Sequence, residues 1–148
     1  MSVEDTEGIR RIQALFCQYL DDGNLDGTME LFTEDAIIHS GGNTHTGTEQ
    51  IYRYLSNFFN GTPPDNRWIH MLTEGVYNFS DDGLTGEGRS YMTAWRCNEI
   101  GRWWMAAVNR HHDRYRKVDG QWKFAEKGME ARGHFRRTSQ DVPTPVHV

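Results

Sequence analysis

The sequence predicts an α+β fold, in which three N-terminal helices pack on a curved, mostly antiparallel sheet and enclose a hydrophobic pocket. Two observations support this prediction. Over the first 60 residues, apolar side chains recur at spacings of three and four, which is typical of amphipathic helices. From Arg67 onward the pattern changes to extended segments separated by turns. A curved sheet wrapped around the helices would leave a cone-shaped pocket between the two layers.

The helical half contains three segments. Apolar residues at helical spacing predict a first helix over residues 4–20, which ends at the sequence DDGN. Asn24 is the expected N-cap of a short second helix, and the stretch AIIHS follows as a brief strand. Thr48 is the expected N-cap of a third helix, which ends at NGTPPDN.

The second half reads as a meander of antiparallel strands. The turn signals SDDG, Gly101 and DG at 119–120 separate its segments. The expected extended segments are 67–79, 84–100, 102–118 and 121–135. We therefore expect one domain over residues 1–137, followed by an extended, proline-containing tail over residues 138–148.

Composition and charge narrow the class of protein. The net charge is -5 and the Lys and Arg residues are scattered, so a nucleic-acid-binding face is not expected. No apolar run approaches the roughly 20 residues that span a bilayer, and the acidic N-terminus does not resemble a signal peptide. These features indicate a cytoplasmic protein without membrane attachment. Cys17 and Cys97 are then expected to be reduced thiols.

The chain is rich in aromatic residues, with seven Phe, six Tyr and five Trp. Such side chains suit the walls of a cavity for a cyclic or aromatic small molecule. No GxGxxG, P-loop, HExxH or CxxC motif is present, so we expect no cofactor and no metal site. The run RHHDR does not change this expectation, because in a strand His111 and Asp113 share one face while His112 lies on the other.

Three stretches carry a resemblance to a known family. They are LDDGNLDGTMELFTEDA, WIHMLTEG and NRHHDRYRKVDGQWKF. Over about residues 7–135 the chain resembles the SnoaL-like branch of the NTF2-like superfamily. Within that branch it is similar to scytalone dehydratase, the bile-acid dehydratases and the hexachlorocyclohexane dehydrochlorinase. The resemblance implies an NTF2-like cone. One departure is that scytalone dehydratase has a functional Tyr on its first strand, where this chain has IIHSGG with His39 and Ser40.

The same resemblance implies a catalytic pair, Asp21 and His70. From the residues alone, Asp21 lies off the apolar stripe of the first helix and would be a solvated helix end. Alternation places His70 on one face with Trp68 and Leu72, toward an apolar interior. In the family the Asp accepts a hydrogen bond from one ring nitrogen and the His acts as general base. We expect the same roles for Asp21 and His70.

Two neighbouring strand positions are expected to contact substrate. Scytalone dehydratase places a polar residue near the position of His111, and a cross-strand polar pair is the alternative for this residue. Asn109 lies on the same face of the predicted strand as His111. Phe16, one helical turn before Asp21, is expected to line the pocket, although membership of the core is an equally good interpretation.

Three further residues complete the predicted substrate-binding set. Tyr91 and Trp95 are candidates for pocket walls, with packing on a sheet face as the alternative. Arg132 lies close to the position at which bile-acid dehydratases carry a functional Arg. Its spacing from Trp122 differs from theirs by one residue.

The leading functional hypothesis is a cofactor-independent lyase. His70, held by Asp21, would remove a proton from a hydrophobic cyclic or aromatic substrate, with loss of water, halide or formaldehyde. The alternatives are a double-bond isomerase of the ketosteroid type, a non-catalytic small-molecule binding protein, and a subunit of a larger assembly. A homodimer or homotrimer is expected, because the adjacent Trp103 and Trp104 place an aromatic side chain on each face of a strand.

Overall fold

The computed structural model describes residues 2–60, 67–98 and 100–134 of the 148-residue chain. The predicted tail over residues 138–148 lies outside the described residues. The helices are α1 (Val3–Asp21), α2 (Leu25–Glu30) and α3 (Gly47–Asn60). Asn24 is the N-cap of α2, as predicted, and its side chain accepts a hydrogen bond from the backbone N–H of Gly27.

The strands form one seven-stranded sheet. They are β1 (Phe32–Ser40), β2 (Asn43–Thr46), β3 (Arg67–Leu72), β4 (Val76–Phe79), β5 (Thr85–Cys97), β6 (Trp103–Val118) and β7 (Gln121–His134). The spatial order is β2-β1-β7-β6-β5-β3, and β4 also pairs with β5. All pairs are antiparallel except β1–β7. The predicted α+β architecture with a mostly antiparallel sheet is confirmed.

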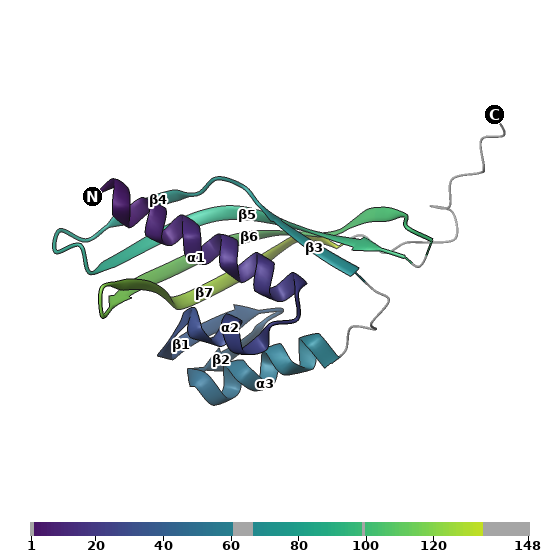
Figure 1. Ribbon diagram of the computed structural model, residues 1–148, viewed down its shortest axis with the longest axis horizontal. Helices are drawn as coiled ribbons and strands as arrows, with labels where there is room; N and C mark the ends of the chain where they lie inside the picture. The colour runs from purple at the N-terminus through teal and green to yellow at the C-terminus, as the bar shows by residue number, and fades with distance from the viewer. Residues whose placement is uncertain (1, 61–66, 99, 135–148) are drawn as a thin grey trace.

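Figure 1 shows how the two layers meet. Helix α1 lies along the sheet, while α3 lies beside β1 and β2. Helix α1 contacts both β3 and β7, which lie on opposite sides of the central strands. Among the described residues, no helix is long and apolar enough to cross a membrane.

The structure corrects three local predictions. The segment 67–79 forms two strands rather than one, and both pair with β5. The hairpin between β1 and β2 was not predicted; its turn uses Gly41 and Gly42 at φ +58° and +80°, which side-chain-bearing residues rarely adopt. Thr48 is not the N-cap of α3, because the helix begins at Gly47 and the Thr48 hydroxyl instead donates to the carbonyl of Glu34.

The core lies between α1 and the inner face of the sheet. Ile9, Ile12 and Phe16 form the predicted stripe and are buried against Tyr115 and Phe124. Full burial of each such side chain contributes roughly 1.5–3 kcal/mol. This contact fixes the distance and direction of α1 relative to the strands.

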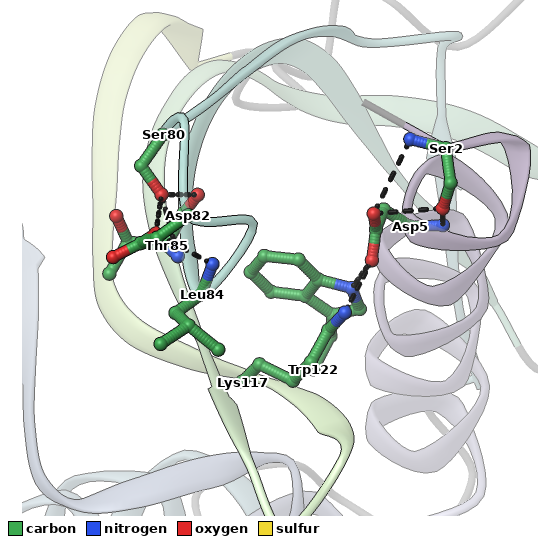
Figure 2. A network of polar contacts seen from close by, with 8 residues as sticks. All are labelled: Ser2, Asp5, Ser80, Asp82, Leu84, Thr85, Lys117 and Trp122. Carbon is green, nitrogen blue, oxygen red and sulfur yellow. Dashed lines mark hydrogen bonds and ion pairs between the residues drawn. The ribbon is translucent and has the colours of Figure 1, made fainter.

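The N-terminal end of α1 is fixed by Asp5 (Figure 2). One carboxylate oxygen accepts hydrogen bonds from Lys117 Nζ at 2.6 Å and from Trp122 Nε1 at 3.0 Å. The other oxygen accepts from the Ser2 hydroxyl and from the Ser2 backbone N–H. The Ser2 hydroxyl oxygen in turn accepts from the Asp5 backbone N–H, and these two backbone bonds form a capping box. The hydrogen bond from Lys117, followed by that from Ser2, holds the pKa of Asp5 well below its usual range. The carboxylate therefore joins the helix to the β6–β7 turn.

Gly8→Ala is expected to lower the free energy of unfolding by about 1–3 kcal/mol. A Cβ at this position would lie 2.6 Å from Cδ1 of Trp122, whose indole is held by Asp5. On an exposed helix the same change would stabilise by up to about 1 kcal/mol. Urea denaturation followed by Trp fluorescence measures the difference, with the exposed Gln18→Ala as control. Unchanged or increased stability of Gly8→Ala would contradict this close packing.

Candidate active site

The end of α1 determines where the Asp21 carboxylate lies. Asp21 is the last helical residue, Asp22 is the C-cap, and Gly23 follows at φ +68° and turns the chain away. Asp22 is exposed to solvent, as expected. Asp21 does lie off the apolar stripe, but this side of the helix faces β3 rather than water, because α1 crosses the sheet toward that strand.

Asp21 and His70 are in direct contact. His70 Nδ1 lies 2.6 Å from Asp21 Oδ1, and the backbone N–H of His70 donates to Oδ2 at 3.0 Å. The side chain of His70 is 5% exposed and that of Asp21 is 21% exposed. Because a carboxylate only accepts hydrogen bonds, Nδ1 carries the hydrogen. The second ring nitrogen, Nε2, is then left to act as a base.

Aromatic side chains surround the imidazole. The Trp68 ring stacks on it with centroids 5.8 Å apart and planes inclined by 13°. The Phe58 ring lies 6.3 Å away, at an inclination of 54°. Ile69 and Met71 are exposed, so the alternation that predicted Trp68 and His70 on the inner face of this strand is confirmed.

His70 lines a cavity of about 870 Å³ between the helices and the sheet. A cavity of this size accommodates a small organic molecule. Much of its wall is apolar, formed by Phe16, Leu20, Leu55, Phe58, Met92 and Met129. Ser40, Tyr54, Arg96 and Asn109 supply polar groups, and the Tyr54 hydroxyl donates to Ser40 Oγ at 2.9 Å. A few polar groups in an apolar wall are typical of a small-molecule site.

Two of the predicted substrate contacts lie at the cavity. Asn109 lines it from β6. Phe16 both lines the cavity and belongs to the core, with its ring 5.7 Å from that of Phe124, so both interpretations of this residue hold.

His111 shares the inner face with Asn109 but is fully buried and does not line the cavity. It pairs with Ser90 on β5 and with Met129 on β7. Neither ring nitrogen has a hydrogen-bond partner among the described residues. Burial is the main reason that the pKa of His111 lies well below its ordinary value, and the charge of Lys127 and the nearby His70 add to the effect. His111 is therefore an uncharged ring behind the cavity wall.

Three predicted contacts lie away from the cavity. Tyr91 is 48% exposed, and Trp95 donates its indole N–H to Thr93 on its own strand. Both occupy odd-numbered positions of β5, as its exposed residues do, whereas the even-numbered Met92 and Arg96 line the cavity. Arg132 is exposed and pairs with Glu130, because its neighbour Ala131 takes the inward position. None of these three residues is among those that line the cavity.

Several lining residues were missed by the sequence analysis, namely Arg96, Tyr54, Trp104 and Met129. The sequence of β5 does indicate that Arg96 faces inward. Glu87 and Arg89 alternate with Gly86, Gly88 and Ser90, which indicates that the even-numbered positions face inward. Trp104 faces the cavity and Trp103 is 41% exposed, so the predicted placement of one Trp on each face is correct.

A buried polar network lies next to the site. Lys127 Nζ is 3.0 Å from Asp113 Oδ2, and both side chains are 1% exposed. The same carboxylate oxygen accepts from the Tyr115 hydroxyl at 3.2 Å, and Gln13 donates to that hydroxyl at 2.6 Å. Burial raises the pKa of Asp113, and Lys127 opposes this effect. Burial likewise raises the pKa of the Cys17 thiol to about 11, so this thiol is not activated.

The run RHHDR spans both faces of β6. His111 and Asp113 are buried on the inner face, whereas His112 is exposed on the outer face. Within residues 2–60, 67–98 and 100–134, no group of three or more His, Cys, Asp or Glu side chains is arranged to hold a metal ion.

His111→Gln is expected to weaken the pH dependence of stability. The ring is neutral when folded but titrates near 6.5 when unfolded, so below that pH the unfolded chain binds the extra proton. The free energy of unfolding then falls with decreasing pH, by up to about 1.4 kcal/mol per pH unit from this residue. Urea denaturation between about pH 7.5 and 5 measures this slope. The exposed His112→Gln is the control; equal slopes in wild type and His111→Gln would contradict the assignment.

Solved structures of other proteins share this architecture. Aln2 from a Streptomyces species has a TM-score of 0.81 at 19% identity, over 88% of this chain and 93% of that one. An NTF2-like protein with a cystatin-like fold from Novosphingobium aromaticivorans has a TM-score of 0.78 at 21% identity, over 88% and 83%. A proposed scytalone dehydratase, also from Novosphingobium aromaticivorans, has a TM-score of 0.74 at 18% identity, over 89% and 88%. These similarities show an NTF2-like fold.

The family to which the chain belongs follows from a comparison of its sequence with family profiles. No curated protein matches the chain significantly. The profile of the SnoaL-like domain matches residues 1–127, which include α1, the Asp21–His70 pair and β3 to β6. The resemblance found in the three sequence stretches is therefore confirmed: the chain belongs to the SnoaL-like domain family.

Proposed function

We propose that the protein is a cofactor-independent lyase that eliminates water, or another small leaving group such as halide or formaldehyde, from a hydrophobic cyclic or aromatic molecule. The observation that carries this proposal is the 2.6 Å contact between Asp21 Oδ1 and His70 Nδ1 at the wall of a largely apolar cavity. The similarity to a proposed scytalone dehydratase agrees with this reaction class.

The geometry supports His70 as general base. Asp21 fixes the ring by accepting from Nδ1 and from the backbone N–H of the same residue. His70 Nε2 would take a proton from a substrate carbon, and the C–H electron pair would become a carbon–carbon double bond as the C–O bond breaks. The imidazolium, stabilised by Asp21, would return its proton to the departing hydroxide, which leaves as water. Such a base typically contributes roughly 10²–10⁴-fold to the rate.

Other polar groups of the cavity wall support charge stabilisation. Tyr54 donates to Ser40 Oγ, so the hydrogen of Ser40 can be donated to a ligand. The Asn109 amide also lines the cavity. A substrate carbonyl next to the carbon that loses its proton would gain negative charge during the reaction, and these donors would stabilise it. Ser40 and Tyr54 thus supply hydroxyl groups in place of the strand Tyr of scytalone dehydratase.

The contact between Asp21 and His70 favours an enzyme over a carrier. Burying the imidazole, and partly burying the carboxylate, costs stability, and binding an apolar molecule does not require the contact between their side chains. An isomerase of the ketosteroid type would use the same base without a leaving group, and product analysis separates it from a lyase. Elimination stands first because the family resemblance is to enzymes of that reaction class.

His70→Ala is expected to lower kcat/KM for elimination by roughly 10²–10⁴-fold. The assay uses β-hydroxy cyclic and fused-ring ketones, whose dehydration gives a conjugated enone that is followed by its ultraviolet absorbance. Circular dichroism checks that the variant is folded. Full turnover by folded His70→Ala, on any compound that the wild type converts, would rule out this mechanism.

Asp21→Asn is expected to lower kcat by at least about tenfold while the fold is retained. An amide can still accept from the His70 backbone N–H, but it cannot stabilise the imidazolium as a carboxylate does. Asp22→Asn makes the same chemical change at the adjacent, exposed residue and should leave kcat unchanged. Equal activity of the two variants would show that Asp21 has no part in the reaction.

A further inference from the structure

Arg96 is a cation in the cavity wall. It lies on the inner face of β5, directly opposite Trp68 on β3, and both side chains line the cavity. The guanidinium carbon lies 4.4 Å from the centroid of the Trp68 ring. Arg96 Nε and Trp68 Nε1 are both buried, and neither has a hydrogen-bond partner among the residues that the structure describes. These two atoms are closed off from the cavity, so the guanidinium can reach a ligand only through its terminal NH2 groups, which have no partner among the described residues.

The charge of Arg96 is also without a counter-ion in the part of the chain that the structure describes. No described carboxylate lies within ion-pair distance of it, whereas Arg10, Arg53 and Arg116 each have an acidic partner at the surface. The Asp21 carboxylate is occupied by His70. Stacking on Trp68 offsets part of the desolvation of the guanidinium, but an aromatic face cannot replace the acceptors that its N–H groups need.

The position of Arg96 relative to the base limits where a ligand group can lie. His70 pairs with Ala94, and Trp68 pairs with Arg96, two residues further along β5. Two residues of a strand span roughly 7 Å. The Trp68 ring contacts both the imidazole and the guanidinium. A group bound by Arg96 would therefore lie about one ring away from the atom that faces His70.

We propose that Arg96, stacked on the Trp68 ring, binds an anionic oxygen of the substrate, a carboxylate or a phenolate. This inference rests on the proposed function only in taking the cavity as the substrate site. The guanidinium supplies the charge, and its terminal NH2 groups supply the hydrogen bonds, that an anionic oxygen requires. The substrate is then an acidic ring compound, with its anionic oxygen at Arg96 and its reacting carbon at His70.

The test compares two ligands of one shape by isothermal titration calorimetry. 2-Naphthoate carries a carboxylate, and 2-naphthylmethanol is its neutral counterpart. The wild type is expected to bind 2-naphthoate about 10- to 100-fold more tightly. Arg96→Met should abolish this preference while changing the affinity for 2-naphthylmethanol by less than about twofold, because Met keeps most of the aliphatic volume. Arg96→Lys should keep part of the preference.

The control for overall charge is Arg110→Met. Arg110 stacks on the exposed Tyr91 on the outer face of the sheet, so its removal changes the net charge equally without touching the cavity. This variant should keep the wild-type preference for 2-naphthoate. Equal binding of the two ligands by the wild type, or a preference that survives in Arg96→Met, would overturn the proposal and leave Arg96 as a packing partner of Trp68.

His70→Ala separates this inference from the proposed function. The preference for 2-naphthoate should persist in this variant, because the carboxylate is bound by Arg96 and not by the base. If the preference persists but wild type and His70→Ala show equal turnover, the lyase mechanism fails while the anion site stands. If the preference is absent while His70→Ala loses turnover, the anion site fails alone.

Discussion

The close packing of α1 on the inner face of the sheet is the constraint on which the remaining geometry depends. Asp5 ties the start of the helix to the β6–β7 turn, and Asp21 ties its end to β3. Glycine on the helix permits the approach, since a Cβ at Gly8 would lie 2.6 Å from Cδ1 of Trp122 on β7. With the helix held at both ends, its last turns cover the cavity through Phe16, and the Asp21 carboxylate is placed without a loop.

The periodicities of the sequence were sufficient to predict the layer of helices, the sheet, and which residues of β3 face inward. They place His70 in the interior, whereas only the family resemblance singled out Asp21, because a helical wheel shows that a residue is off the stripe but not what lies opposite. Tyr91 and Trp95 were proposed for their aromatic type, whereas their parity in the strand places them away from the cavity. The charged residues of β5 indicate its outward positions, and the same parity brings Arg96 into the cavity. Which residues of a strand face the cavity depends on the pairing register, and the register is set by the whole sheet.

The polar groups beneath the cavity were harder to anticipate. His111, Asp113 and Lys127 alternate with charged neighbours, so hydrophobicity gives no indication of which face is buried. In the structure, Asp113 and Lys127 neutralise each other and are joined through Tyr115 to Gln13 of α1. This network restricts how the strands and the helix can shift relative to each other, even though Asp113 Oδ1 has no hydrogen-bond partner among the described residues. The network does not line the cavity, so it holds the cavity wall in place from behind and does not contact a ligand.

The hydrogen bond from the His70 backbone N–H to Asp21 also affects the exposed edge of the sheet. Strand β3 lies at the edge, where unpaired amides can recruit a strand from another molecule. Asp21 accepts a hydrogen bond from one of these amides, the backbone N–H of His70. The residue that orients the base therefore also makes this amide unavailable for pairing with a strand of another molecule. An acid at this position would protect a relative from aggregation even if that relative catalysed nothing. The histidine, rather than the aspartate, is thus the residue by which active and inactive members of such a family should be told apart.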